Sequence, residues 1–176
     1  MEKTKNEELG RLSVEDFLKT EKIPVVIVLD NVRSALNVGS VFRTADAFRV
    51  SKIYLCGITP VPPNRDILKS ALGATETIQW EYATTTIEVI NNLKEKNFYL
   101  AAIEQTKTSI PLQHFNLSKE KKLALIFGHE VDGVNQEVIN ECDASIEIPQ
   151  QGTKHSLNIA VCAGIVVWEV FRKLTM

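Results

Sequence analysis

The feature that most constrains the fold is a repeated order of segments, in which a short apolar run is followed by a polar turn and then by residues at helical spacing. Residues 25–29 form an unbroken β-branched and aliphatic run, which is typical of a parallel strand buried on both faces. Strands are predicted at 25–29, 53–56, 75–80, 98–103, 123–127 and 144–148, and helices at 13–20, 38–48, 66–72, 86–96, 136–141 and 157–174. This alternation predicts an α/β fold with a mostly parallel sheet flanked by helices.

The composition is that of an ordinary globular protein. Of the 176 residues, 44% are hydrophobic and 24% are charged, so a core can form without disulfides or a structural metal. The sequence contains no run of 18 apolar residues, and its first eleven residues lack the apolar segment of a signal peptide. We therefore expect no membrane span, and one domain at 23–176 that follows a short N-terminal extension with a helix at 1–22.

The cysteines and histidines give no sign of a metal site. Cys56, Cys142 and Cys162 are an odd number of cysteines, they are far apart, and each lies in an apolar or helical context. The three histidines are equally scattered, and neither a CxxC nor an HxxxH spacing occurs. This pattern predicts reduced thiols in a cytoplasmic protein that binds no metal.

The charge distribution excludes one class of nucleic-acid-binding protein. The formal net charge of −2 argues against a protein that coats nucleic acid without specificity. The charge is nevertheless uneven, because six basic residues between positions 33 and 69 are accompanied by only Asp46 and Asp66. A local basic patch that contacts a nucleic acid therefore remains compatible with the sequence.

The usual phosphate-binding motifs are absent or incomplete. No GxGxxG follows the first predicted strand. The segment 128–133 has the glycine spacing of a P-loop, but Val134 and Asn135 stand where a P-loop has Lys and Ser or Thr. The sequence thus disfavours both a nucleoside triphosphatase and a dinucleotide-binding protein.

Three predicted strand ends are instead rich in polar residues. The segment 31–45 reads NVRSALNVGSVFRTA, 125–134 reads LIFGHEVDGV, and IEIP at 146–149 is followed by SLNIAV at 156–161. Polar side chains and free N–H groups at such positions suit helix capping and ligand binding equally well. In their order and spacing, the three segments closely resemble the three signature motifs of the SpoU (TrmH-like) family of RNA ribose 2′-O-methyltransferases, and the resemblance extends over about residues 25–170.

The resemblance implies a fold, a cofactor and a set of site residues. It implies a deep C-terminal trefoil knot that holds S-adenosyl-L-methionine, and a homodimer, which the largely apolar helix at 157–174 also favours. By match to the motifs, the implied catalytic residues are Asn37, Arg43, Glu130, Ser156 and Asn158. The implied cofactor-binding residues are Gln105, Thr106, Gly128, Ile148 and Leu157, of which the first two match more loosely.

Each of these residues also has a plain structural interpretation. Asn37, Ser156 and Asn158 suit helix caps, Glu130 suits the first turn of a helix, and Arg43 on an amphipathic helix would by default face solvent. The chemistry of Arg43 is open as well, because a guanidinium is a poor general base. It either accepts the 2′-hydroxyl proton transiently or stays charged and stabilises the developing alkoxide.

The substrate is less constrained than the reaction. Many relatives carry an added RNA-binding domain, whereas this chain has a short, acidic N-terminal extension and ends at Met176, just after the last predicted helix. We therefore expect the catalytic dimer itself to recognise RNA, which favours a tRNA loop over a site in ribosomal RNA. The alternatives are a non-catalytic knotted dimer that binds RNA and, with no supporting motif, an enzyme that methylates a protein or small molecule.

Overall fold

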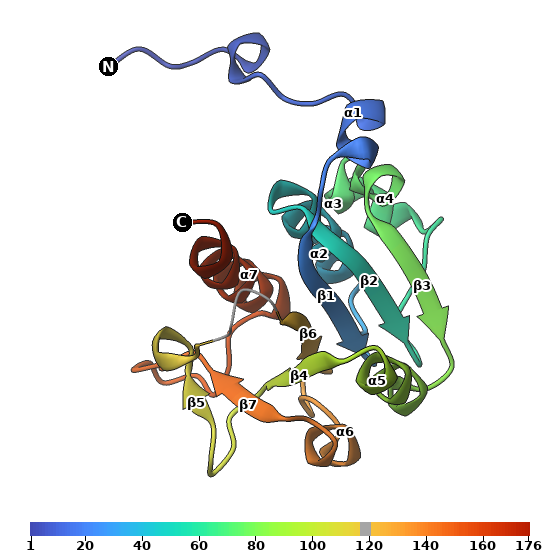
Figure 1. The fold of residues 1–176 in the computed structure, drawn as a ribbon, viewed down its shortest axis with the longest axis vertical. Coiled ribbons are helices and arrows are strands. Elements are labelled where there is room, and N and C mark those ends of the chain that lie inside the picture. Colours follow the sequence, from blue (N-terminus) through green and yellow to red (C-terminus); the bar gives the residue numbers. More distant parts are fainter. Residues whose placement is uncertain (117–120) are drawn as a thin grey trace.

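A computed structural model describes residues 1–116 and 121–176 as a seven-stranded sheet with helices on both faces (Figure 1). The strands are β1 (Ile23–Asp30), β2 (Val50–Cys56), β3 (Gln79–Ala83), β4 (Phe98–Ile103), β5 (Ile110–Pro111), β6 (Lys122–Phe127) and β7 (Ala144–Glu147). They lie in the order β3-β2-β1-β6-β4-β7-β5, and every pairing is parallel. The predicted α/β fold with a parallel sheet is confirmed.

Each α-helix except α4 (Ala74–Thr77) begins after a residue whose side chain caps it. They are α1 (Val14–Lys19), α2 (Ala35–Ala47), α3 (Arg65–Ala71), α4 (Ala74–Thr77), α5 (Thr86–Glu95), α6 (Gln136–Asn140) and α7 (Ile159–Thr175), with short 3-10 turns η1 (Asn6–Leu9) and η2 (Leu112–His114). Ser34 caps α2 and Asn158 caps α7, each by accepting a backbone N–H of the first turn. The helices α2 and α7 therefore start at residues that belong to two of the three polar segments.

The sheet divides the core into two layers, because successive residues of a strand point to opposite faces. Val25, Ile27 and Leu29 of β1 pack with α2, α3 and α7, whereas Val26 and Val28 pack on the other face with α5 and α6. All five side chains are at most 4% exposed. Burial on both faces explains why this strand is apolar at every one of these positions.

Two edge strands differ from the prediction. The strand expected at 75–80 is wrong in its first part, since residues 74–77 form α4 and the strand is β3 at Gln79–Ala83. Its residues are half-buried or exposed, so β3 lacks the apolar pattern that marks a central strand. The two-residue strand β5 was not predicted, because it is too short to show any period.

The predictions on membrane spans, on the division of the chain and on the knot differ in how far the structure bears on them. No helix among the described residues is long and apolar enough to cross a membrane. The division into an extension at 1–22 and a domain at 23–176 stays a prediction, as does the trefoil knot, which the strand order alone does not establish.

Candidate active site

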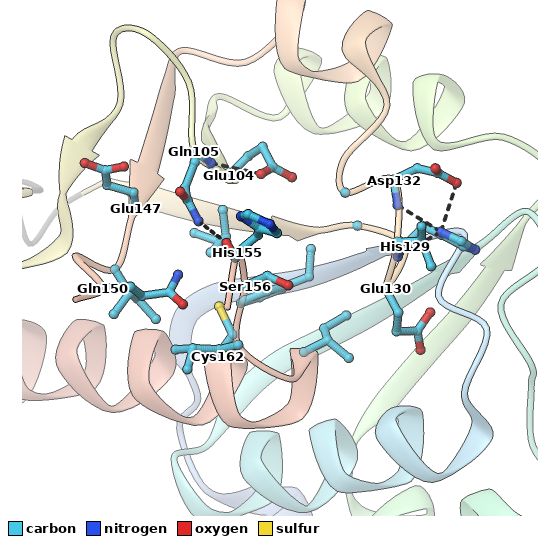
Figure 2. A pocket seen from close by; sticks show the side chains of 18 of the residues that line it. Glu104, Gln105, His129, Glu130, Asp132, Glu147, Gln150, His155, Ser156 and Cys162 are labelled. Carbon is cyan, nitrogen blue, oxygen red and sulfur yellow. Dashed lines mark hydrogen bonds and ion pairs between the residues drawn. The ribbon is translucent and has the colours of Figure 1, made fainter. Parts of the chain in front are cut away.

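A cavity of about 350 Å³ lies at the carboxyl ends of β4, β6 and β7 (Figure 2). Its lining includes Ile103 at the end of β4, Phe127 at the end of β6, Glu147 at the end of β7 and Cys162 on α7. Ligands of open parallel sheets bind at the carboxyl ends of the strands. The position and size of the cavity are therefore those of a small-molecule site.

Most of the predicted site residues meet at this cavity. Those that line it are Gln105, Gly128, Glu130, Ile148, Ser156 and Leu157. Asn37 and Asn158 do not line it, but hydrogen bonds join them to Glu130 at its edge. Thr106 and Arg43 do not belong to the lining.

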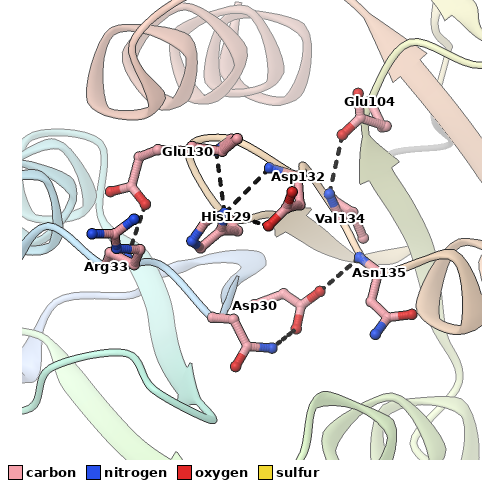
Figure 3. A network of polar contacts seen from close by, with 10 residues as sticks. Asp30, Arg33, Glu104, His129, Glu130, Asp132, Val134 and Asn135 are labelled. Carbon is pink, nitrogen blue, oxygen red and sulfur yellow. Dashed lines mark hydrogen bonds and ion pairs between the residues drawn. The ribbon is translucent and has the colours of Figure 1, made fainter.

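Glu130 joins the second polar segment to the first. Its carboxylate accepts the backbone N–H of Arg33 at 2.9 Å (Figure 3). It also accepts the backbone N–H of Ser34 at 2.9 Å and the side-chain Nδ2 of Asn37 at 3.1 Å. These are the free donors at the start of α2, where the helix dipole favours a negative charge. Glu130 therefore caps α2, a helix that lies almost a hundred residues earlier in the chain.

Asn37 and Asn158 extend this contact to the third polar segment. Asn37 Oδ1 accepts from Asn158 Nδ2 at 3.2 Å, and Asn158 Oδ1 accepts the N–H of Ala160 at 2.9 Å. The orientation of each amide follows from its neighbours, since the Glu130 carboxylate takes only donors and a backbone N–H takes only acceptors. A continuous chain of hydrogen bonds thus runs from Glu130 through Asn37 and Asn158 to the start of α7.

The environment of Glu130 keeps its carboxyl group ionised. Partial burial by itself would raise the pKa of Glu130, but hydrogen bonds from the Arg33, Ser34 and Glu130 N–H groups and from Asn37 outweigh it. The net result is a pKa below the ordinary value of a glutamate. Glu130 is therefore suited to hold helix α2 and to present a negative charge, and not to donate a proton near neutral pH.

The loop 128–135 forms one wall of the cavity through its backbone. His129 and Gly133 exchange two backbone hydrogen bonds, both at 2.9 Å, which fold the loop into a tight turn. At Gly128 a Cβ atom would lie 2.1 Å from the backbone of Gly133 and Val134, so only glycine fits there. Asp30, a buried carboxylate at the end of β1, accepts the N–H of Asn135 at 2.9 Å and fixes the far end of the loop (Figure 3).

Arg43 lies outside the cavity of its own chain. It is exposed in the third turn of α2 and lines a different hollow, formed with the N-terminal segment and α4. Six positions separate it from Asn37, which places it about 9 Å farther along the helix axis. Within one chain the structure does not bring Arg43 to the other predicted catalytic residues.

The two loosely matched cofactor residues, Gln105 and Thr106, both follow β4, but only one of them reaches the cavity. Gln105 lines the cavity, and its Nε2 donates to the carbonyl of His155 at 2.8 Å. Thr106 turns into the loop instead, where its hydroxyl accepts the N–H of Thr108 at 3.3 Å. Glu104 was not among the predicted site residues, yet its carboxylate lines the cavity and accepts the N–H of Val134 at 3.0 Å. A carboxylate directly after a strand, beside Gln105, was the signal available for it.

Cys162 is the only cysteine among the described lining residues, and it is not set up as a nucleophile. Burial raises the pKa of its thiol to about 11. The thiolate is the reactive form of cysteine, and it is scarce at neutral pH when the pKa is this high. The cavity therefore does not support covalent catalysis by cysteine. Among residues 1–116 and 121–176, no cluster of metal-ligating side chains occurs.

Together, the parallel sheet and a cavity framed by three polar loops define a class of α/β proteins that bind a small ligand at the strand ends. A family model described as the SpoU rRNA methylase family matches residues 24–168, and the chain belongs to this family. The match spans all three polar segments.

The relatives found by sequence and by structure agree with this assignment. A protein of Staphylococcus aureus described as a TrmH family tRNA/rRNA methyltransferase is 32% identical over 163 residues, which are 90% of this chain and 64% of that protein. The chain thus spans less than two thirds of that relative. The AdoMet-bound rRNA methyltransferase of Sinorhizobium meliloti has a TM-score of 0.82 at 28% identity, covering 91% of this chain and 61% of that one. A TrmH/SpoU tRNA modifying enzyme of A. aeolicus shares the fold, with a TM-score of 0.80 at 24% identity over 91% of this chain and 80% of that one.

Proposed function

We propose that the protein is an S-adenosyl-L-methionine-dependent RNA methyltransferase that modifies the 2′-hydroxyl of a ribose. The observation that carries the proposal is the hydrogen-bonded chain from Glu130 through Asn37 to Asn158. It unites all three family motifs at the edge of one cavity. Names of the relatives support RNA methylation in general, and the match of the motifs supports the ribose hydroxyl as the target.

The residues of the cavity fit the proposed cofactor. Gly128 lets the two ends of the loop 128–135 approach closely, and the cavity volume lies in the range of small-molecule sites. Carboxylates line it, and no lysine or arginine does so among the described lining residues, which suits a positively charged ligand. We assign cofactor binding to Gly128, Ile148 and Leu157, with Gln105 closing the cavity against His155.

The chemistry required of the protein is mainly alignment and charge stabilisation. The bound cofactor supplies an electrophilic methyl group, whereas a ribose hydroxyl is a weak nucleophile until its proton leaves. We assign Arg43 the role of gripping the neighbouring phosphate and stabilising the developing alkoxide, since an exposed guanidinium stays charged. Water then takes the proton. We assign the orientation of the ribose to Ser156, which lines the cavity, and to Asn158, which contacts Asn37 at its edge.

This assignment requires a second copy of the chain. Val161, Ile165 and Trp168 on one side of α7 are 53%, 39% and 44% exposed, and Leu36 on the neighbouring α2 is 48% exposed. Arg43 follows Leu36 by seven positions, so both lie on the same outer face of α2. A homodimer that covers this apolar face places Arg43 of each copy at the interface, where it can serve its partner's cavity.

A charge on the exposed face of α7 should abolish the dimer and the activity together. For Ile165→Glu we expect a mass near 19.7 kDa in sedimentation, where the wild-type protein sediments as twice that mass. Ile58→Glu is the matched control, because Ile58 is 64% exposed in a loop away from α7. A wild-type protein that stays monomeric at micromolar concentration would contradict the dimer.

A loop of tRNA is the substrate class we propose, with ribosomal RNA as the second candidate. The exposed segment 150–158 borders the cavity through Gln150, His155, Ser156 and Leu157, so a nucleotide displayed on a loop can reach it without rearrangement of a long RNA. The second candidate has its own support in the rRNA methyltransferase that is 28% identical. Either substrate agrees with the cytoplasmic location that we propose.

The decisive experiment maps where the methyl group goes. Purified protein is incubated with methyl-labelled S-adenosyl-L-methionine and separately with total tRNA and ribosomal RNA lacking this modification. We expect label in tRNA, recovered after digestion as a nucleoside methylated on the ribose. Label on a base would refute the 2′-hydroxyl as the target, and absence of transfer to any RNA would refute the proposed activity.

A further inference from the structure

Glu104 lies outside the three motifs, yet its carboxylate helps to hold the cavity together. It is the first residue after β4 and is half-buried. Its Oε2 accepts the N–H of Val134 at 3.0 Å (Figure 3), and its Oε1 accepts the N–H of Gln105 at 2.9 Å. Its own N–H donates to the carbonyl of Ile146 at 3.0 Å. One residue thereby contacts the ends of β4 and β7 and the loop that follows β6.

The loop opposite Glu104 is shaped to receive this carboxylate. Gly133 has a φ of +71°, and a Cβ atom there would lie 2.1 Å from Glu104 Oε2. Only backbone therefore approaches the carboxylate from that side. The next residue, Gln105, reaches the third loop through its hydrogen bond to His155, so the pair 104–105 connects all three loops around the cavity (Figure 2).

Four carboxylates line the cavity, and among the described residues those of Glu104 and Glu147 have neither an ion pair nor a helix start to compensate their charge. Glu104 differs from Glu147 in that two hydrogen bonds hold its carboxylate in place. Of the carboxylates that line the cavity, Glu130 is held by the donors at the start of α2, and Asp132 lies 3.1 Å from His129. Glu104 accepts one neutral backbone N–H on each oxygen and forms no ion pair among the described residues. A full negative charge therefore stays at the wall of a partly enclosed cavity, where electrostatic interactions are stronger than in water.

We propose that Glu104 is a positioning and specificity-determining residue, which makes the cavity prefer the cationic S-adenosyl-L-methionine over its neutral demethylated product. The inference rests on the proposed function. The cofactor carries a sulfonium, an ammonium and a carboxylate, and loss of the methyl group removes the sulfonium charge. A fixed negative charge stabilises the cation and does little for the neutral thioether, so product release is favoured.

The test compares the affinities of three ligands without RNA and without turnover. Isothermal titration gives the Kd of S-adenosyl-L-methionine, of S-adenosylhomocysteine, and of sinefungin, in which a protonated amine replaces the sulfonium. For Glu104→Gln we expect the two cationic ligands to weaken about tenfold relative to S-adenosylhomocysteine, the size of one partly screened charge interaction. Glu104→Asp, which keeps the charge, should keep the wild-type ratio even if all three ligands bind more weakly.

Glu137→Gln is the matched control, since it removes the same charge from an exposed position on α6 that does not line the cavity. An equal loss of affinity for all three ligands in Glu104→Gln, or an unchanged ratio, overturns the inference and leaves the proposed function intact. A wild-type protein that binds none of them overturns both. If Glu104→Gln does not fold, the wild-type protein provides the test. The preference for S-adenosyl-L-methionine, given by the Kd of S-adenosylhomocysteine divided by the Kd of S-adenosyl-L-methionine, should decrease with added salt, and a constant preference overturns the inference.

Discussion

Replacing Arg43 with alanine should lower kcat for RNA methylation by about 10²- to 10³-fold, which is the typical loss for one electrostatic group that acts in the transition state. The Kd of S-adenosyl-L-methionine should change by less than about twofold, because Arg43 does not line the cavity of its own chain. Lysine should restore little activity, since a point charge cannot reproduce the planar fork that grips a phosphate. Single-turnover kinetics and isothermal titration measure the two effects separately. Wild-type turnover in Arg43→Ala, or a defect limited to cofactor affinity, would show that the assigned role is wrong.

Replacing Gly128 with alanine should mainly weaken cofactor binding, in contrast to the loss of kcat expected for Arg43→Ala. Its Cβ would lie 2.1 Å from backbone atoms of Gly133 and Val134, which cannot move aside as a side chain can. We expect a loss of roughly 1–3 kcal/mol of stability and an increase of the cofactor Kd by at least about 100-fold, because the loop forms a cavity wall. Thermal unfolding and titration are the measurements. Gly152→Ala is the control, since no atom lies within 4 Å of a Cβ there, and a Gly128→Ala protein that binds like wild type would contradict the assigned cofactor site.

The two variants together test whether Arg43 acts on its partner. In a mixed dimer of Arg43→Ala and Gly128→Ala, one copy has an intact cavity and the other has an intact arginine. If Arg43 acts across the interface, the mixed dimer contains one complete site and recovers up to about half of the wild-type activity. If it acts within its own chain, both sites stay incomplete and the mixed dimer is inactive. Co-expression with two different tags and tandem purification provides the mixed species.

The sequence was sufficient to predict an element or a site residue where burial or a motif left a strong local pattern. The central strand β1 is buried on both faces and was predicted from its unbroken apolar run, whereas β3 at the edge was placed too early because its exposed residues carry no such pattern. Of the residues that the sequence suggested as helix caps, Asn158 does cap α7, whereas α2 is capped by Ser34 and not by Asn37.

The contacts within the site could not be predicted from the sequence, because they join residues that are far apart in the chain. Glu130 fits the start of a helix in any local interpretation, but the helix it caps is α2 and not the one that follows it. Glu104 belongs to no motif, and only its place directly after a strand, beside Gln105, distinguished it from an ordinary surface acid. In the dimer that we propose, the position of Arg43 relative to a substrate depends on the second copy of the chain, and no pattern within one chain specifies that geometry.

The strand order has a consequence for how the protein is made. β4 has only β6 and β7 as neighbours in the sheet, and both are synthesised after it. By contrast, β1, β2 and β3 are synthesised first and occupy consecutive positions in the sheet, with β2 between the other two. A growing chain can therefore assemble its first half-sheet early, while β4 waits unpaired until residues 122–127 emerge and enter between it and β1. Pairings across such long sequence separations form slowly and leave apolar surface exposed meanwhile. We expect nascent chains that end before β6 to depend on chaperones, and the ligand cavity to be the last part of the molecule to form.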